Sequence, residues 1–142
     1  MTSKFKFNDI LNFGLNYTYT QTYDGAEQDN PANTYTNSQL VRVPRNIINL
    51  ITNLKIPGYK DLDVSLRTKW SDEARDYGNG NRTWNDEVID DYLVNDLSIK
   101  YNLWDTYNLF FDIDNILDEK YETTRDYSQM DRSFNFGIRR VY

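Results

Sequence analysis

The carboxylates are the side chains of this sequence that could do chemistry. The sequence contains no cysteine and no histidine, so it lacks thiolate nucleophiles, the usual zinc ligands and the commonest general base. Asp112 and Asp114 could form a catalytic pair, but in an alternating segment they point to the same face of a strand, and no cleft is indicated. We therefore expect a hydrated or ion-paired wall here and no enzyme active site.

A second group of carboxylates, around Asp76, invites comparison with a calcium-binding loop. Read from Asp76, the bidentate position twelve falls on Glu87. Gly78 and Gly80, however, stand where side-chain oxygens are needed, and Asn81 stands where the invariant glycine belongs. A solvated loop is the favoured interpretation, and we expect no metal and no cofactor.

The composition restricts the class of protein and its partners. The net charge is −6, from 22 acidic and 16 basic residues, and no run of Lys or Arg is long enough to follow a phosphate backbone. Nucleic acid is therefore not an expected partner. No apolar run approaches the roughly 20 residues of a membrane-spanning helix. The 15% aromatic content, with 12 Tyr, is typical of strands with one apolar face, one hydrated face and amphipathic rings at the boundary.

Alternation of apolar and polar residues predicts about six strands. About ten alternating residues suffice for one tilted membrane crossing. In the second strand Ile47 and Ile51 blur the two faces, and residues 1–9 could hold the tail of a preceding strand. The predicted strands are approximately 11–20, 45–56, 61–70, 92–101, 107–114 and 132–142.

The connections between these strands alternate in length. Short turns are expected at Pro57-Gly58 and around 103–106, whereas 24–37, 71–91 and 115–131 are long and polar. Short turns at one end and long loops at the other are the plan of an outer-membrane barrel. We therefore predict an all-β, antiparallel, up-and-down meander that is part of a transmembrane β-barrel. Single-chain bacterial barrels begin at eight strands, so further strands are expected upstream.

Two sets of side chains are candidate functional residues. Aromatics in or beside the long connections are candidate ligand contacts, although a place in an interfacial girdle is the commoner role for such rings. These aromatics are Tyr77, Trp84 and Tyr92. Charged residues on the polar strand face are expected to line the lumen, where they would pair across strands or with a plug. This lumen set is Asp63, Arg67, Lys69, Asp96, Lys100, Asp112 and Arg139.

Three segments resemble a known family. Residues 115–122, Asn-Ile-Leu-Asp-Glu-Lys-Tyr-Glu, are similar to the Asn-Leu-Phe-Asp-Lys-x-Tyr motif that follows the penultimate barrel strand of TonB-dependent outer-membrane receptors. Residues 132–139 resemble their last strand, and Val43-Pro44-Arg45 resembles the Val-Pro-Arg that opens an earlier strand. Because the three segments have the family's order and spacing, the resemblance covers nearly the whole chain. The cobalamin and siderophore receptors are the most similar group.

The resemblance implies that residues 1–142 are the C-terminal segment of a receptor barrel in the bacterial outer membrane. The complete receptor would import a ferric siderophore, cobalamin or a similar large nutrient. Its implied partners are outer-membrane lipid, its own plug domain, the remaining barrel strands, TonB through an N-terminal part, and the barrel-assembly machinery. The implied membrane-insertion signal is Phe134, Phe136, Ile138 and Tyr142. Arg140 departs from the family pattern, because it occupies an outward position; we expect it to snorkel at the interface.

Two other architectures are compatible with parts of the pattern. A complete small barrel of eight strands would require two strands beyond the six predicted. A soluble β-sandwich binding module would place the apolar faces of two sheets against each other. The sequence does not indicate which nutrient is the substrate.

Overall fold

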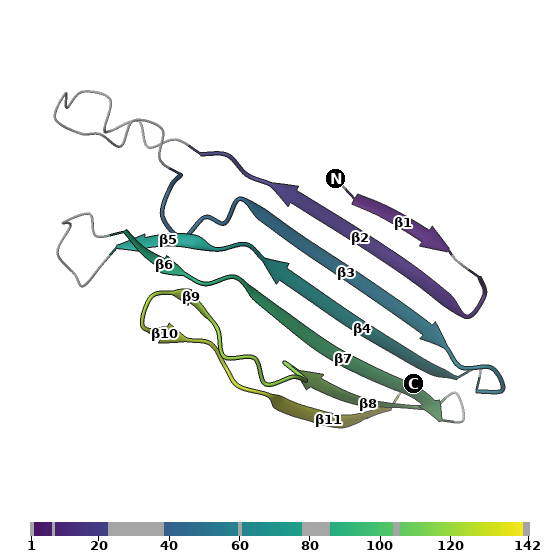
Figure 1. The fold of residues 1–142 in the computed structure, drawn as a ribbon. Coiled ribbons are helices and arrows are strands. Elements are labelled where there is room, and N and C mark those ends of the chain that lie inside the picture. The colour runs from purple at the N-terminus through teal and green to yellow at the C-terminus, as the bar shows by residue number, and fades with distance from the viewer. Residues whose placement is uncertain are drawn as a thin grey trace, which may run out of the picture.

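The computed structural model describes residues 2–6, 8–22, 39–59, 61–77, 86–103 and 106–140. Seven strands form one antiparallel sheet in the order β1-β2-β3-β4-β7-β8-β11 (Figure 1). They are β1 (Thr2–Lys6), β2 (Leu11–Tyr19), β3 (Asn46–Lys55), β4 (Leu62–Ser71), β7 (Tyr92–Leu103), β8 (Tyr107–Asp114) and β11 (Ser133–Arg140). Two short hairpins lie outside this order: β5 (Ala74–Tyr77) with β6 (Asp86–Ile89), and β9 (Glu122–Thr124) with β10 (Tyr127–Ser128). The predicted all-β, up-and-down meander is confirmed.

The sequence-based expectation of about six strands was one short. The possible strand tail within residues 1–9 is β1, which pairs with β2 from Thr2↔Asn16 to Lys6↔Asn12. Two of the predicted long connections also contain structure, since 71–91 holds β5 and β6 and 115–131 holds β9 and β10. Strands this short offer too little alternation to be recognised in a sequence. The predicted loop 24–37 lies outside the described residues.

The register separates the strand side chains onto two faces. Cross-strand partners share a face, and the pairs Ile48↔Trp70, Val64↔Ile99 and Phe111↔Phe136 lie on the same side of the sheet. This apolar face remains open to the surroundings, with side-chain exposures as high as 84% at Phe136. Both blurred positions are now assigned, because Ile47 pairs with Ser71 and Ile51 pairs with Arg67 on the opposite, polar face.

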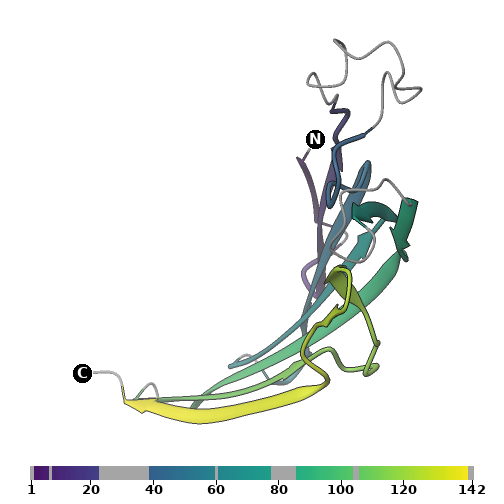
Figure 2. The ribbon, with the colours of Figure 1, turned by 90° about the vertical axis from the view of Figure 1, so that its left-hand side faces the viewer.

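The sheet is open and strongly curved. Figure 2 shows it sweeping from the β1–β2 edge to the β11 edge, and these two edges do not meet. The described strands therefore form neither a closed eight-stranded barrel nor two packed sheets. Both hairpins extend from one end of the sheet (Figure 1), which we call the long-connection end and which also carries residues 39–45. In the part of the chain that the structure describes, no helix is long and apolar enough to cross a membrane.

The predicted Pro57-Gly58 turn is present at the other end. The Tyr59 N–H donates to the Ile56 carbonyl at 3.0 Å, and Gly58 has a φ of 85°. Pro at the second position and a positive φ at the third define a type II turn. This tight turn leads directly into the β3–β4 pairing, in which Lys55 lies opposite Asp63.

Gly137 makes room for an aromatic ring on the polar face. It pairs with Phe110 in the β8–β11 register, and a Cβ on Gly137 would clash with Phe110 Cζ. Gly14 is a looser counterpart on β2, because its added Cβ would lie 3.9 Å from the Ile51 Cβ, an ordinary contact. A ring that covers a cross-strand glycine fixes the relative position of the two strands.

We predict that Gly137→Ala lowers the free energy of unfolding by roughly 1 to 3 kcal/mol, because Phe110 must leave its position. Urea unfolding followed by tryptophan fluorescence measures the effect. Gly14→Ala is the matched control and should be close to neutral. The double variant Gly137→Ala/Phe110→Ala should be as stable as Phe110→Ala alone, because the added methyl group then has no ring to displace. Equal stability of the two single variants would contradict this account of Gly137.

Candidate functional site

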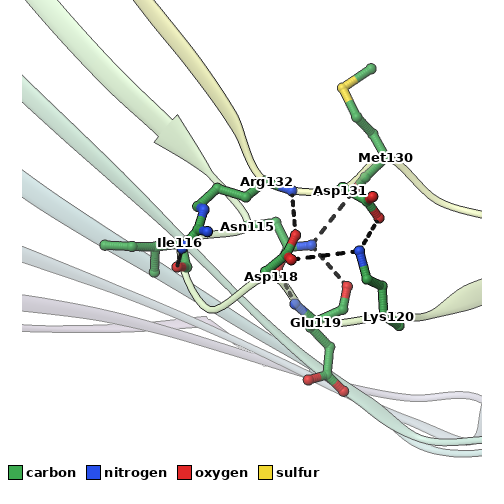
Figure 3. Close-up of polar contacts among 8 residues, drawn as sticks. All are labelled: Asn115, Ile116, Asp118, Glu119, Lys120, Met130, Asp131 and Arg132. Atoms are coloured by element: carbon green, nitrogen blue, oxygen red, sulfur yellow. Dashed lines mark hydrogen bonds and ion pairs between the residues drawn. The ribbon is translucent and has the colours of Figure 1, made fainter.

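The connection from β8 to β11 begins with a buried asparagine that joins its two ends (Figure 3). Asn115 Nδ2 donates to the Glu119 carbonyl at 2.9 Å and to the Met130 carbonyl at 3.5 Å. Its Oδ1 accepts from the Glu119 N–H at 2.9 Å. Asn115 is only 3% exposed. One side chain therefore holds both the start and the end of the connection.

Asparagine suits this position for two reasons. Its φ is 52°, in the left-handed region, where Asn is strongly enriched among non-glycine residues. Its side chain also combines an amide donor with a carbonyl acceptor, and both are used here. Asp118, with a φ of 56°, closes the turn by donating its N–H to the Asn115 carbonyl at 2.9 Å.

A charged cluster closes the same connection. Asp118 Oδ1 accepts from the Arg132 N–H at 2.9 Å, and Lys120 Nζ lies 2.6 Å from Asp131 Oδ1 and 3.5 Å from Asp118 Oδ2. The hydrogen bond from Arg132 lowers the pKa of Asp118 below its ordinary 3.8. The hydrogen bond to Asp131 raises the pKa of Lys120 above its ordinary 10.5.

The two shifts define a pH range for this support. The contribution of Asp118 is present above its ordinary pKa and is lost as the pH falls through the lowered value. The contribution of Lys120 is present below its ordinary pKa and is lost as the pH rises through the raised value. Both are available between these limits. The side chains are exposed, so each pair adds only modest stability.

The connection folds back onto the polar face of the sheet. The Tyr121 and Tyr92 rings lie 4.5 Å apart between centroids, and Lys69 Nζ lies 5.3 Å from the Tyr92 centroid. Burial raises the pKa of the Tyr121 phenol, and Tyr92 adds to the shift. The Asn115 N–H donates to Asp96 Oδ1 at 3.0 Å. The motif at residues 115–122 therefore attaches the connection to β7, and Lys69 of β4 lies over the same Tyr92 ring.

The register places all seven residues of the predicted lumen set on this polar face. Opposite charges meet across strands, since Asp63 pairs with Lys100 and Arg67 pairs with Asp96. Arg67 and Asp96 form an ion pair at 3.7 Å. A hollow of about 340 Å³ contains four members of the set, namely Asp63, Lys100, Asp112 and Arg139. The alternating signs favour paired charges over a track of a single sign.

The predicted ligand contacts are placed only in part. Tyr92 is 8% exposed and packs against Tyr121, so little of its ring is open to a ligand. Trp84 and the side chain of Tyr77 lie outside the described residues. Phe134, Phe136 and Ile138 lie on the apolar face, and Tyr142 lies outside the described residues. Arg140 pairs with Tyr107 on that same face, as expected.

The role of Asp76 could not be inferred from the sequence. In the sequence, Asp76 was considered as the start of a cation-binding loop. In the structure its carboxylate accepts hydrogen bonds from Arg42 Nε at 2.8 Å and from the Arg125 N–H at 2.7 Å. These partners are 34 and 49 residues away in the sequence, so no local pattern could reveal them. The Tyr92–Tyr121 contact was missed for the same reason.

One open sheet with an exposed apolar face and a polar face of paired charges defines the wall of an outer-membrane β-barrel. The family model for the TonB dependent receptor-like beta-barrel matches residues 2–116. The chain belongs to this family, and it corresponds to the C-terminal barrel portion. The family consists of non-enzymatic transporters of the bacterial outer membrane. The suspected resemblance and the predicted location are thereby confirmed.

Solved structures show the same fold. The ferric enterobactin receptor PfeA of Pseudomonas aeruginosa has 18% identity and a TM-score of 0.74, over 96% of this chain and 21% of its own. The ferripyoverdine receptor of P. aeruginosa has 18% identity and a TM-score of 0.72, over 95% of this chain and 18% of its own. The siderophore receptor PirA of Acinetobacter baumannii has 16% identity and a TM-score of 0.71, over 96% of this chain and 20% of its own.

The chain thus spans about a fifth of the length of these receptors. A comparison with curated protein sequences found no match.

We predict that Asn115→Ala lowers the local opening free energy of residues 116–131 by roughly 2 to 3 kcal/mol, because three hydrogen bonds are lost at a buried position. Faster amide hydrogen exchange at Glu119 measures it. Asn135→Ala is the matched control, since Asn135 is exposed and donates to Asp114 within the sheet. Unchanged exchange at Glu119 would show that the asparagine does not hold the connection.

Proposed function

We propose that this chain is the closing wall of a TonB-dependent importer whose substrate is a ferric siderophore. The wider class of substrates is large nutrients, which includes cobalamin. The observation that carries the proposal is the segregation of side chains in a sheet of this family: an apolar face for lipid, and a polar face of paired charges for an enclosed interior. The printed names of PfeA and the ferripyoverdine receptor, which describe siderophore receptors, support the substrate class.

The polar face faces the lumen in this proposal, and its partners are the plug domain and the remaining strands. The hollow lined by Asp63, Lys100, Asp112 and Arg139 would receive polar groups of the plug. Arg67, whose side chain is 63% exposed, remains accessible for the same purpose. The edges at β1 and β11 carry backbone groups that the remaining strands would pair, because hydrocarbon does not tolerate an unpaired edge.

The long-connection end lies outside the cell in this proposal, and the short turns lie in the periplasm. Tyr77 and Trp84 remain candidate ligand contacts. The Tyr92 ring packs against Tyr121 of the β8–β11 connection. Contact between Tyr92 and a ligand would require that connection to lift from the sheet.

The last strand would be recognised by the barrel-assembly machinery. Phe134, Phe136 and Ile138 project from the apolar face with exposures of 60%, 84% and 63%, and Tyr142 would complete the signal. TonB would act on an N-terminal part of the complete receptor, so the energy for import would come from the inner membrane.

Uptake by the complete receptor tests this function. We expect cells that express it to accumulate radiolabelled iron from ferric enterobactin or ferripyoverdine, and to do so only when TonB is present. Phe136→Asp should reduce the amount of receptor in the outer membrane, because it places a charge on the lipid face. Asn53→Asp is the control, because Asn53 is exposed on the polar face and lies between Asn12 and Ser65. Uptake that is independent of TonB would contradict the proposed class of importer, and cobalamin uptake without iron uptake would contradict the proposed substrate class.

A further inference from the structure

The strongest feature that the proposed function leaves unused is the carboxylate of Asp76. Asp76 lies on β5, and its side chain has 0% exposure. A buried carboxylate is costly unless charged or hydrogen-bonding partners compensate for its lost hydration. Those partners come from two other connections at the long-connection end.

The first partner is Arg42, in the segment 39–45 that precedes β3. Arg42 Nε donates to Asp76 Oδ1 at 2.8 Å, and the Arg42 N–H donates to the Arg75 carbonyl at 2.7 Å. Arg42 has a φ of 62°, and both its side chain and its N–H donate hydrogen bonds to β5. The segment is thereby attached to the β5–β6 hairpin at two points.

The second partner is the turn of the β9–β10 hairpin. The Arg125 N–H donates to Asp76 Oδ2 at 2.7 Å, and the next residue, Asp126, has a φ of 62°. β6 and β9 are also in contact, and the two hairpins lie side by side at one end of the sheet (Figure 1). The two oxygens of one carboxylate thus hold two different connections against a third.

We propose that Asp76 is a positioning residue that couples these three connections, so that displacement of any one of them loosens the other two. Its two carboxylate oxygens accept hydrogen bonds from Arg42 and Arg125, which are far from Asp76 and from each other in the sequence. In the receptor proposed above, these connections form part of the outer mouth. The coupling would then allow a ligand that touches one connection to move all three. The inference about the mouth rests on the proposed function, whereas the coupling is a property of this chain.

Hydrogen exchange on the complete receptor in outer-membrane vesicles tests the coupling. Arg42→Gln removes the ion pair from the segment 39–45. We expect amide exchange to rise roughly ten-fold or more within residues 122–128, on a separate connection, because a buried carboxylate that has lost one of its charged partners holds the turn less firmly. Arg42→Lys, which keeps the charge, should restore much of the protection. Asp76→Asn should raise exchange in both segments together.

Arg45→Gln is the matched control, because Arg45 lies in the same segment, is exposed and forms no ion pair shown among the described residues. It should leave exchange in residues 122–128 unchanged. A rise confined to residues 39–45 in Arg42→Gln would overturn the coupling. Failure of Arg42→Gln and Asp76→Asn to assemble, when Arg45→Gln assembles, would overturn it as well, because Asp76 would then be required for folding. Neither result bears on iron uptake, which tests the proposed function separately.

Discussion

The pairing of backbone groups between neighbouring strands is the interaction on which the rest of this structure depends. In hydrocarbon an unpaired N–H or C=O costs several kcal/mol, so each strand must be hydrogen-bonded along its length. The registers from β1 to β11 meet this requirement for the interior strands. The same registers decide which side chains meet the lipid, because a shift of one residue would exchange the two faces.

The long-connection end is stabilised in a different way. Among the described residues, the buried ones all lie at or near this end: Gln39, Ser71, Asp76, Ile89, Tyr92, Val94 and Asn115. The non-glycine residues with positive φ also lie there, namely Arg42, Asn115, Asp118 and Asp126. Polar junctions centred on Asp76 and Asn115 therefore organise the connections. The strands themselves rely on their surroundings, since their apolar face is open.

The strands and their faces could be predicted from the sequence, because period-two alternation is a local signal. The Pro57-Gly58 turn and the placement of Arg140 followed from equally local rules. Strand β1 was anticipated only as a possible strand tail, and the hairpins within the connections were missed, because two to five residues carry too little pattern. The contacts of Asp76 and the Tyr92–Tyr121 packing could not be predicted, since they join residues far apart in the chain. The roles assigned to residues in ligand contact, in the lumen and in membrane insertion remain predictions, and Trp84, Tyr142 and the side chain of Tyr77 lie outside the described residues.

The most direct test of the two-faced wall is to measure the lipid exposure of four successive positions of β4 in the complete receptor. The chain has no cysteine, so in a receptor whose other cysteines, where present, are replaced, single cysteines at Val64, Ser65, Leu66 and Arg67 can each carry a fluorophore. Brominated lipids should quench the fluorophores at Val64 and Leu66 and leave those at Ser65 and Arg67 bright. Equal quenching at all four positions, or quenching at Ser65 and Arg67 alone, would contradict the assignment of the apolar face to lipid.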